Sequence, residues 1–406
     1  MKHSLNVNKK DPKYKLLKQI LKIIGSKKSL NALSRAGIKN RQKVIDSIKI
    51  LFIAMFFECN ISFVVNEINR SFKLRKFAGF EGEIMPVDKV YECLARYSAE
   101  DYAKFVNYFL NRYNRVMRNK NKTLIVDATP STCDFNYDKQ FIPPEHLEEL
   151  NLKWGHSETK GSFIGFKVTV TLNKDTLMPV SILIHSGTPY DSRLFEEILE
   201  ELSTRRIIKK GDVILFDRGY YAYKNYVLGI VKYKIVPVIF PRSNFNINKL
   251  KGMMSYPLDI YHENKDTELL KNKFNALCSK LYDLLENWDD LKPERGIIED
   301  FFKVAKDAFG LGKFHSYTVE SMSRNIYLCL LLTSLVVQQG YKTKTALQRL
   351  AEGDVTQDTP VKKNSNKKKK SEDNSNDETD NTQKTGQQLL DIELSNGQTV
   401  LADFAT

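Results

Sequence analysis

The sequence predicts an α/β protein: a mixed sheet flanked by helices, with an all-helical domain before it and a disordered linker after it. Three observations carry this prediction. Residues 1–119 show apolar positions at helical spacing, and residues 120–345 alternate between strand-like and helical runs. A linker is predicted over residues 346–388, because the chain from residue 356 onward is charged and nearly devoid of apolar groups. Residues 389–406 regain apolar residues and are expected to form a short tail.

The helical domain, residues 1–119, is expected to bind DNA. Apolar residues recur at helical spacing over Leu30–Ile68 and Ala99–Val116, and Phe72–Lys76 between them is a basic patch flanked by aromatic residues. Residues 1–50 hold 14 Lys and Arg against two acids. The whole chain carries 63 Lys and Arg against 49 Asp and Glu, and such an excess supplies salt-sensitive affinity for DNA. The alternative is an ordinary solvated helical surface.

The elements after residue 120 come in an order that favours one fold. They are strand-like runs at residues 123–127, 163–172 and 179–185, then a helix (192–202), a strand (212–216), a helix (221–229), a strand (234–240) and the helix that contains Glu299. Three antiparallel strands followed by β-α-β crossovers are the element order of the ribonuclease H-like fold, in which the first and fourth strands lie side by side. Residues 241–290 exceed what this core needs, so we predict a mainly helical insertion there. Its Trp288 either anchors this small subdomain or stacks on an unpaired base.

Two aspartates end strand-like runs. Asp127 follows Thr-Leu-Ile-Val and Asp217 follows Val-Ile-Leu-Phe. An unpaired carboxylate is expensive to bury inside a strand, so we predict that each stands at a strand end and faces a cleft. If the first and fourth strands are neighbours, the two carboxylates come together.

A third acid, Glu299, is placed by helical geometry. A helix turns by about 100° per residue, which puts Arg295, Glu299 and Lys306 on one stripe, opposite an apolar face that includes Ile298 and Phe301. Such a helix packs on a sheet with its apolar face and presents two cations and a carboxylate. The alternative is a surface helix with an i,i+4 Arg/Glu pair.

These motifs resemble the DDE transposases of the insertion sequence four family. The string Arg295-x3-Glu299-x6-Lys306 reproduces the R-E-K part of the family's Y-R-E-K signature. Val126–Thr129 is similar to its first-acid motif, Gly165–Lys167 to its G-[YF]-K strand, and Leu215–Tyr220 to its second-acid motif. The resemblance covers roughly residues 120 to 340. It departs from the family at two positions, since Lys292 stands where the signature tyrosine is expected and Thr169 where a histidine often follows.

The resemblance implies an enzyme that holds two divalent ions, Mg²⁺ with Mn²⁺ as a substitute, in each active site. Asp127, Asp217 and Glu299 are its implied catalytic residues and metal ligands. Magnesium prefers oxygen ligands, and two such ions can activate the attacking oxygen and stabilise the leaving oxygen in a displacement at phosphorus. The implied DNA-binding residues are Arg295, Lys306, Lys292, Lys167, Arg218 and Tyr220.

The sequence thus predicts a DNA transposase that binds the terminal inverted repeats of its element, cuts at its ends and joins them to target DNA. Two ends must be held together, so a homodimer or higher multimer on DNA is expected. One alternative is a structure-selective endonuclease of the same fold, which cuts without joining. Another is a domesticated transposase that only binds DNA. Its expected mark is a lost acid, and all three acids are present, but Lys292 in place of tyrosine keeps this alternative open.

Cysteine usage and hydropathy indicate the compartment. The five cysteines are scattered without a C-x-x-C pair, which argues against zinc knuckles and a disulfide framework and is typical of reduced core residues. The longest apolar run, Ile326–Val337, is too short to cross a bilayer, so no membrane partner is expected. The first apolar stretch is broken by Lys9, Lys10 and Asp11, so no secretory leader is visible. We therefore expect a cytoplasmic, nucleoid-associated prokaryotic protein.

Overall fold

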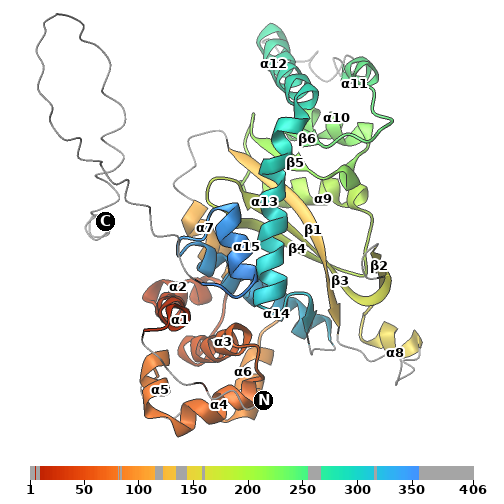
Figure 1. The fold of residues 1–406 in the computed structure, drawn as a ribbon. Helices are drawn as coiled ribbons and strands as arrows, with labels where there is room; N and C mark the ends of the chain where they lie inside the picture. The colour runs from red at the N-terminus through yellow and green to blue at the C-terminus, as the bar shows by residue number, and fades with distance from the viewer. Residues whose placement is uncertain are drawn as a thin grey trace, which may run out of the picture. The chain divides into compact units, whose positions relative to one another are not determined.

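The computed structural model shows a helical region below a sheet that carries helices on both faces (Figure 1). It describes residues 5, 10–80, 82, 85–114, 122–133, 144–157, 161–254, 267–314 and 318–355. Residues 356–406, which include most of the predicted linker and the whole predicted tail, lie outside the described residues. The described part belongs to one compact unit, Met1–Asp358.

The N-terminal region is helical, as predicted. Its helices are α1 (Pro12–Ile24), α2 (Lys27–Arg35), α3 (Arg41–Phe56), α4 (Ile61–Arg70), α5 (Phe72–Ala78), α6 (Val87–Ala95) and α7 (Ala99–Asn114). The long apolar pattern from residue 30 to residue 68 is divided among α2, α3 and α4. Asn40 and Glu58 break it, because each adopts a left-handed backbone with φ near 50° that a helix cannot include. Helix α3 forms the centre of this region, with Ile45, Ile48 and Phe52 fully buried.

The sheet has the topology that the ribonuclease H-like prediction requires. Its strands are β1 (Thr123–Cys133), β2 (Trp154–Ser157), β3 (Gly161–Asn173), β4 (Pro179–Ser186), β5 (Val213–Phe216), β6 (Val236–Ile239) and β7 (Lys313–Phe314). In the described part the main path runs β2-β3-β1-β5-β6, with β4 paired to β3 and β7 to β1. Strands β1, β3 and β4 are antiparallel, whereas β1, β5 and β6 are parallel. The first and fourth predicted strands, β1 and β5, are therefore neighbours.

Strand β1 differs from its prediction. It does not end at Asp127 but continues to Cys133, and Asp127 pairs with Val170 of β3. The extension is held by pairing with β3 on one side and with the short strand β7 on the other. Gly165 allows this close approach, since a Cβ atom there would lie 2.3 Å from the carbonyl oxygen of Ser131. The short strand β2 was also missing from the prediction.

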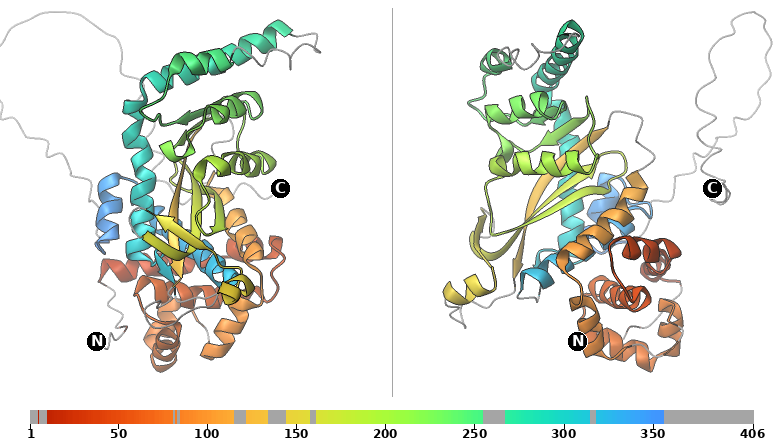
Figure 2. Two further views of the ribbon diagram at one scale, coloured as in Figure 1. Left: turned by 90° about the vertical axis from the view of Figure 1, so that its right-hand side faces the viewer. Right: turned by 180° about the vertical axis from the view of Figure 1, so that it is seen from behind.

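Helices cover both faces of the sheet. Helices α9 (Asp191–Thr204) and α10 (Tyr223–Val231) lie on one face and α13 (Lys292–Lys303) on the other (Figure 2). The chain leaves β5 through a 3₁₀ turn, Arg218–Tyr220, and α13 continues into a π-helical turn, Val304–Ala308. The other helices of the C-terminal half are α8 (Pro144–Glu149), α14 (Val319–Val337) and α15 (Lys344–Ala351).

Helix α14 connects the sheet to the N-terminal helices. It contains the predicted buried helix 326–337 and packs on both α7 and β4. Its Arg324 donates a hydrogen bond to the backbone oxygen of Leu94 at 3.2 Å. Among the described residues, no single helix is long and apolar enough to cross a membrane; α3 and α4 pass that test only as a pair, which is bent by 108°.

The segment 241–290 contains helices α11 (Ile247–Met254) and α12 (Thr267–Glu286), in keeping with a helical insertion. Residues 255–266 lie outside the described part, and the domain boundaries stay predictions. Trp288 packs at the base of this segment, with its ring 5.5 Å from that of Phe240 and 4.0 Å from the Lys292 Nζ. These contacts support the anchoring role of Trp288 over a role in base stacking.

Candidate active site

Two neighbouring strands bring the predicted aspartates together. Val126 of β1 is in register with Phe216 of β5, so the next residues, Asp127 and Asp217, lie side by side. They diverge from there, because β1 continues while the chain after β5 enters the 3₁₀ turn. The side chain of Asp127 is 15% exposed and that of Asp217 is 32% exposed. The first aspartate is therefore the deeper of the two.

Helix α13 brings Glu299 to the same place. The helix packs against β1 and buries Ile298 and Phe301, as its apolar face predicts. Phe302 is buried as well. Arg295 and Glu299, one turn apart, face the aspartates.

Arg295 contacts all three acids. Its Nη2 lies 3.1 Å from Asp127 Oδ2 and 3.3 Å from Asp217 Oδ1, and its Nη1 lies 2.7 Å from Glu299 Oε1. The guanidinium is only 18% exposed. A planar cation with several donors is suited to bridge carboxylates in this way. The predicted acids thus converge on a shared arginine.

The electrostatics of the cluster follow from burial and charge. Burial raises the pKa of Asp127 to about 7, Arg295 opposes this rise, and the nearby charge of Asp217 adds to it. The backbone N–H of Ala128 donates to Asp127 Oδ1 at 2.8 Å and favours the charged form. Burial lowers the pKa of Arg295, but the three carboxylates outweigh this effect and raise it above its ordinary value. The guanidinium therefore stays charged.

The donor set suits a hard divalent cation, because all three side chains offer carboxylate oxygens. Within the described residues, however, no three His, Cys, Asp or Glu side chains are close enough to hold one ion together. Arg295 lies between the acids and takes up their inward-facing oxygens. In this structure the three carboxylates therefore bind Arg295, and their oxygens are of the donor type that a divalent ion takes.

Comparison with known proteins decides the family. The model of the transposase DDE domain matches residues 118–335, which is more than half of the chain. The chain belongs to the DDE transposases. No curated protein and no solved structure matches it. The assignment to the insertion sequence four family stays a prediction.

The other predicted DNA contacts of this DDE transposase lie at different depths. Lys306 is in the π-helical turn, beside Gly312. The prediction that Lys306 shares a face with Arg295 and Glu299 assumed a regular α-helix. The π turn changes the angle between successive residues, so this assumption fails at Lys306. The Lys292 ammonium group lies over the Trp288 ring and pairs with Asp289. Arg218 is exposed directly after Asp217.

Tyr220 is a correction to the predicted DNA contacts. It is 1% exposed, and its ring packs 5.2 Å from that of Phe216. The 3₁₀ turn after β5 directs it into the core, where DNA does not reach it in this conformation. This burial favours packing, which is the more common role of an aromatic residue at a strand-to-helix turn.

Lys167 forms an ion pair with Asp191, a residue that the sequence analysis did not single out. The Lys167 Nζ lies 2.7 Å from Asp191 Oδ1 and donates a hydrogen bond to the backbone oxygen of Pro189 at 2.7 Å. Asp191 also packs against the turn after Asp217, since a Cβ atom on Gly219 would lie 2.8 Å from its Oδ2. The only sequence signal was an acid in the first turn of α9. The pair supports the second-acid turn, and contact of Lys167 with DNA stays a prediction.

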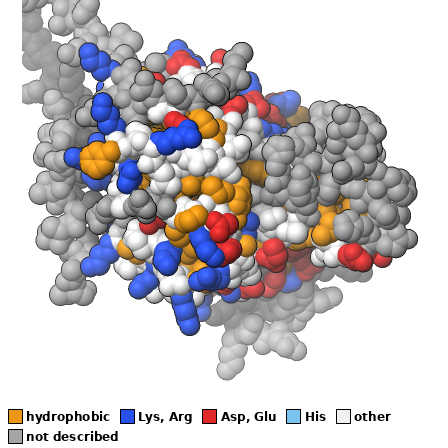
Figure 3. Space-filling model, turned by 90° about the horizontal axis from the view of Figure 1, so that it is seen from below, with side chains coloured by type: hydrophobic (Ala, Val, Ile, Leu, Met, Phe, Trp, Pro, Cys, Tyr) orange, Lys and Arg blue, Asp and Glu red, His pale blue; other side chains and the backbone are white. Residues whose placement is uncertain are grey.

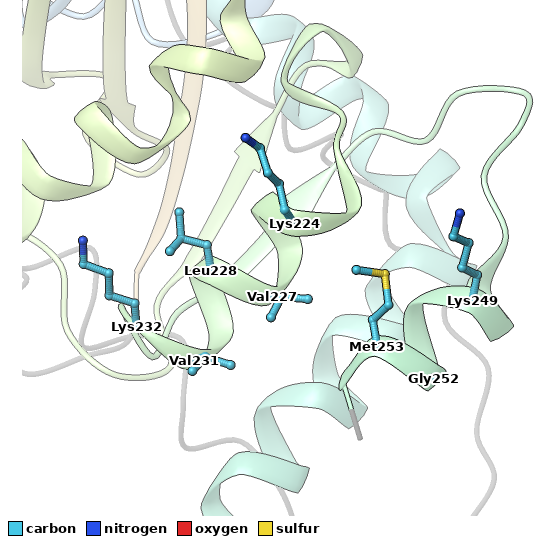
Figure 4. A pocket seen from close by; sticks show the side chains of 8 residues that line it. All are labelled: Lys224, Val227, Leu228, Val231, Lys232, Lys249, Gly252 and Met253. Carbon is cyan, nitrogen blue, oxygen red and sulfur yellow. The ribbon is translucent and has the colours of Figure 1, made fainter. Parts of the chain in front are cut away.

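A separate cavity of about 680 Å³ opens between α10 and α11 (Figure 4). Val227, Val231 and Met253 give it an apolar lining, and Lys224 and Lys249 lie at its edge. None of the three clustered acids lines it. This cavity therefore does not belong to the candidate active site of the transposase.

Proposed function

We propose that this DDE transposase binds the terminal inverted repeats of its element, cuts at the element ends and joins them to target DNA. One observation carries the proposal. Two neighbouring strands and a helix that packs on them direct Asp127, Asp217 and Glu299 onto the same guanidinium. These elements come from distant parts of the chain, so the cluster depends on the fold and not on local sequence.

The three acids are the proposed ligands of two Mg²⁺ ions, with Mn²⁺ as a substitute. Asp127 is the deepest of the three, and together with Asp217 and Glu299 it would hold the ions. When bound, two such ions activate the attacking oxygen and stabilise the leaving oxygen of a displacement at phosphorus. Hydrolysis and strand transfer are the same displacement with different nucleophiles, so one site serves both.

Arg295 has two proposed roles. Without metal and DNA it neutralises three carboxylates that would otherwise repel one another. With metal bound it moves away and holds a DNA phosphate, for which the guanidinium offers a bidentate fork. Lys306 and the exposed Arg218 are proposed to hold further phosphates. Two ends must be processed together, so the active form is proposed to be a homodimer or higher multimer.

The test uses labelled DNA fragments that span the two boundaries of the DNA element encoding the chain. Wild type and Glu299→Gln are compared for cleavage and joining with Mg²⁺ and with Mn²⁺. Glu294→Gln is the matched control, because Glu294 lies on the same helix but pairs with Lys174. Joined products from wild type and from the control, but not from Glu299→Gln, support the proposal.

The other outcomes indicate a different function or a different catalytic site. Cleavage without joining indicates a structure-selective endonuclease. Binding of the fragments without cleavage indicates a chain that only binds DNA. Full activity of Glu299→Gln would show that the cluster is not the catalytic site.

A further inference from the structure

The 3₁₀ turn that follows Asp217 is short and weakly closed. Two backbone hydrogen bonds hold it, from the Tyr220 N–H to the Asp217 oxygen at 3.0 Å and from the Tyr221 N–H to the Arg218 oxygen at 3.2 Å. Hydrogen bonds in a 3₁₀ turn have poorer geometry than those in an α-helix, so the position of such a turn depends on its surroundings. Because Asp217 stands directly before the turn, the groups that hold the turn also affect where this carboxylate points.

Gly219, in the middle of this turn, lies against the side chain of Asp191. A Cβ atom on Gly219 would be 2.8 Å from Asp191 Oδ2 and 3.4 Å from the Asp191 Cβ. Gly219 is not among the described glycines with positive φ, so its backbone would accept an alanine. It is the contact with Asp191 that requires glycine at this position. The turn and the first residue of α9 are therefore in direct contact, with no room for a methyl group between them.

The carboxylate of Asp191 is itself held in place by Lys167. The two side chains of this ion pair are 28% and 13% exposed, and an ion pair that is partly shielded from water is stronger than one on the surface. Lys167 belongs to β3, which pairs with β1 along Leu124–Thr132, the stretch that contains Asp127. A chain of contacts thus runs from the central sheet through Lys167 and Asp191 to the turn after the second acid.

Asn225 of α10 links the same two segments a second time. It is 2% exposed, and its Nδ2 donates hydrogen bonds to the backbone oxygens of Tyr220 at 2.9 Å and of Ser192 at 3.3 Å. A side-chain amide nitrogen has two N–H donors, so both are used here. Tyr220 ends the turn and Ser192 follows Asp191, so the turn after β5 and the first turn of α9 are joined at two points.

We propose that Asp191 is a positioning residue for the second acid. Held by Lys167, its carboxylate fixes the turn at Gly219, so that Asp217 reaches the guanidinium that it shares with the other two acids. This inference rests on the proposed function, because it explains how one of the three acids is kept in place to hold an ion. Residues that orient metal ligands from behind are worth about 10- to 100-fold in metal affinity.

The test uses Gly219→Ala, which adds one methyl group and changes no charge. The methyl group displaces either the turn or the Asp191 carboxylate, so we expect the full chain to bind Mn²⁺ about 10-fold more weakly. Binding is measured by calorimetric titration of Mn²⁺ without DNA, at a temperature at which thermal melting shows each variant to be folded. Gly252→Ala is the matched control, because a Cβ atom at Gly252 of α11 meets nothing within 4 Å, and it should bind Mn²⁺ as wild type does.

A double-mutant cycle tests whether Asp191 transmits the effect. Asp191→Ala should by itself weaken Mn²⁺ binding, because the turn loses its support. It also makes room for the methyl group, so Gly219→Ala/Asp191→Ala should bind Mn²⁺ as tightly as Asp191→Ala alone. Glu196→Gln controls for the loss of a charge, because Glu196 lies on the same helix but pairs with Lys232 at 2.8 Å, and it should bind as wild type does.

DNA affinity in EDTA is a second readout, and it should not change. The helical region predicted to bind DNA carries its own Lys and Arg side chains, which spread over the face seen from below in Figure 3. Neither Gly219 nor Asp191 belongs to this region. Equal DNA affinity together with weaker Mn²⁺ binding would locate the defect of Gly219→Ala at the acid cluster.

The outcomes separate this inference from the proposed function. If folded Gly219→Ala binds Mn²⁺ as tightly as wild type, the contact does not position Asp217 and the inference is wrong. Losses that multiply in the double variant overturn it as well, because the methyl group would then act without Asp191. Unchanged Mn²⁺ binding by Asp217→Asn would refute the assignment of ions to the acids and this inference with it. Mn²⁺ binding that depends on Asp217 and Gly219, without cleavage of the element ends, would refute the proposed function and leave the role of Asp191 intact.

Discussion

Asp127 is expected to destabilise the metal-free protein at neutral and alkaline pH. Its pKa rises from an ordinary value of 3.8 to about 7 in the folded chain because the carboxyl is buried. A raised pKa for an acid means that the folded chain holds the proton more tightly than the unfolded chain. The resulting stabilisation is complete below about pH 4 and is lost as the pH rises to about 7. Above pH 7 the folded chain carries a buried charge, which Arg295 and the backbone N–H of Ala128 compensate in part.

The size of the effect follows from the shift. A difference of about three pKa units corresponds to about 4 kcal/mol. The side chain is 15% exposed, and solvent screens part of this, so we expect about 2–3 kcal/mol. The substitution Asp127→Asn removes the charge and keeps the shape. At about 2 °C per kcal/mol for a chain of this size, the Tm should rise by about 5 °C at pH 8.

The assay is thermal melting of wild type and Asp127→Asn in EDTA between pH 4 and pH 8.5. The variant should exceed the wild type in Tm at pH 8, and the difference should vanish near pH 4. Asp175→Asn is the control, since Asp175 is exposed in the turn between β3 and β4, and it should show no such trend. A lower Tm for Asp127→Asn at pH 8 would refute the expectation, because the ion pair with Arg295 would then stabilise the fold by more than burial of the charge destabilises it.

The remaining predictions concern the neighbours of this carboxyl. Arg295→Gln leaves three carboxylates without their shared cation, so the Tm of this variant in EDTA at pH 8 should be several degrees below that of wild type. Mg²⁺ should restore part of the loss. An unchanged Tm would mean that repulsion among the three carboxylates does not destabilise the fold. Mg²⁺ should raise the Tm of wild type but not of Asp127→Asn, and an equal rise in both would place the ion elsewhere. Asp191→Asn removes the anionic partner of Lys167, a side chain that is only 13% exposed. The free energy of unfolding, measured in urea, should fall by about 1–3 kcal/mol. An unchanged value would show that the pair does not stabilise the fold. Tyr220→Phe should leave DNA affinity within about twofold of wild type, since the ring is buried, and a large loss would restore its predicted DNA contact.

Local patterns in the sequence identified most of the elements and singled out the residues of the cluster, although they missed β2 and the extension of β1. The spacing of Arg295 and Glu299 placed them on one helix face, because the helical period depends only on the backbone. The apolar runs before Asp127 and Asp217 identified two strands. The element order then predicted that these strands are neighbours, and the register of β1 with β5 confirms it.

Contacts between distant residues decided the rest. The pairing of Arg295 with Asp127 joins residues 168 positions apart, so no local period reports that the arginine lies among the acids. The continuation of β1 beyond Asp127 depends on β3 and β7, and the π turn at Lys306 interrupts the period on which its predicted position depended. The sequence by itself thus singled out the charged side chains that form the cluster. Only the tertiary structure decided which of them meet, because burial and ion pairing depend on packing between segments that are far apart along the chain.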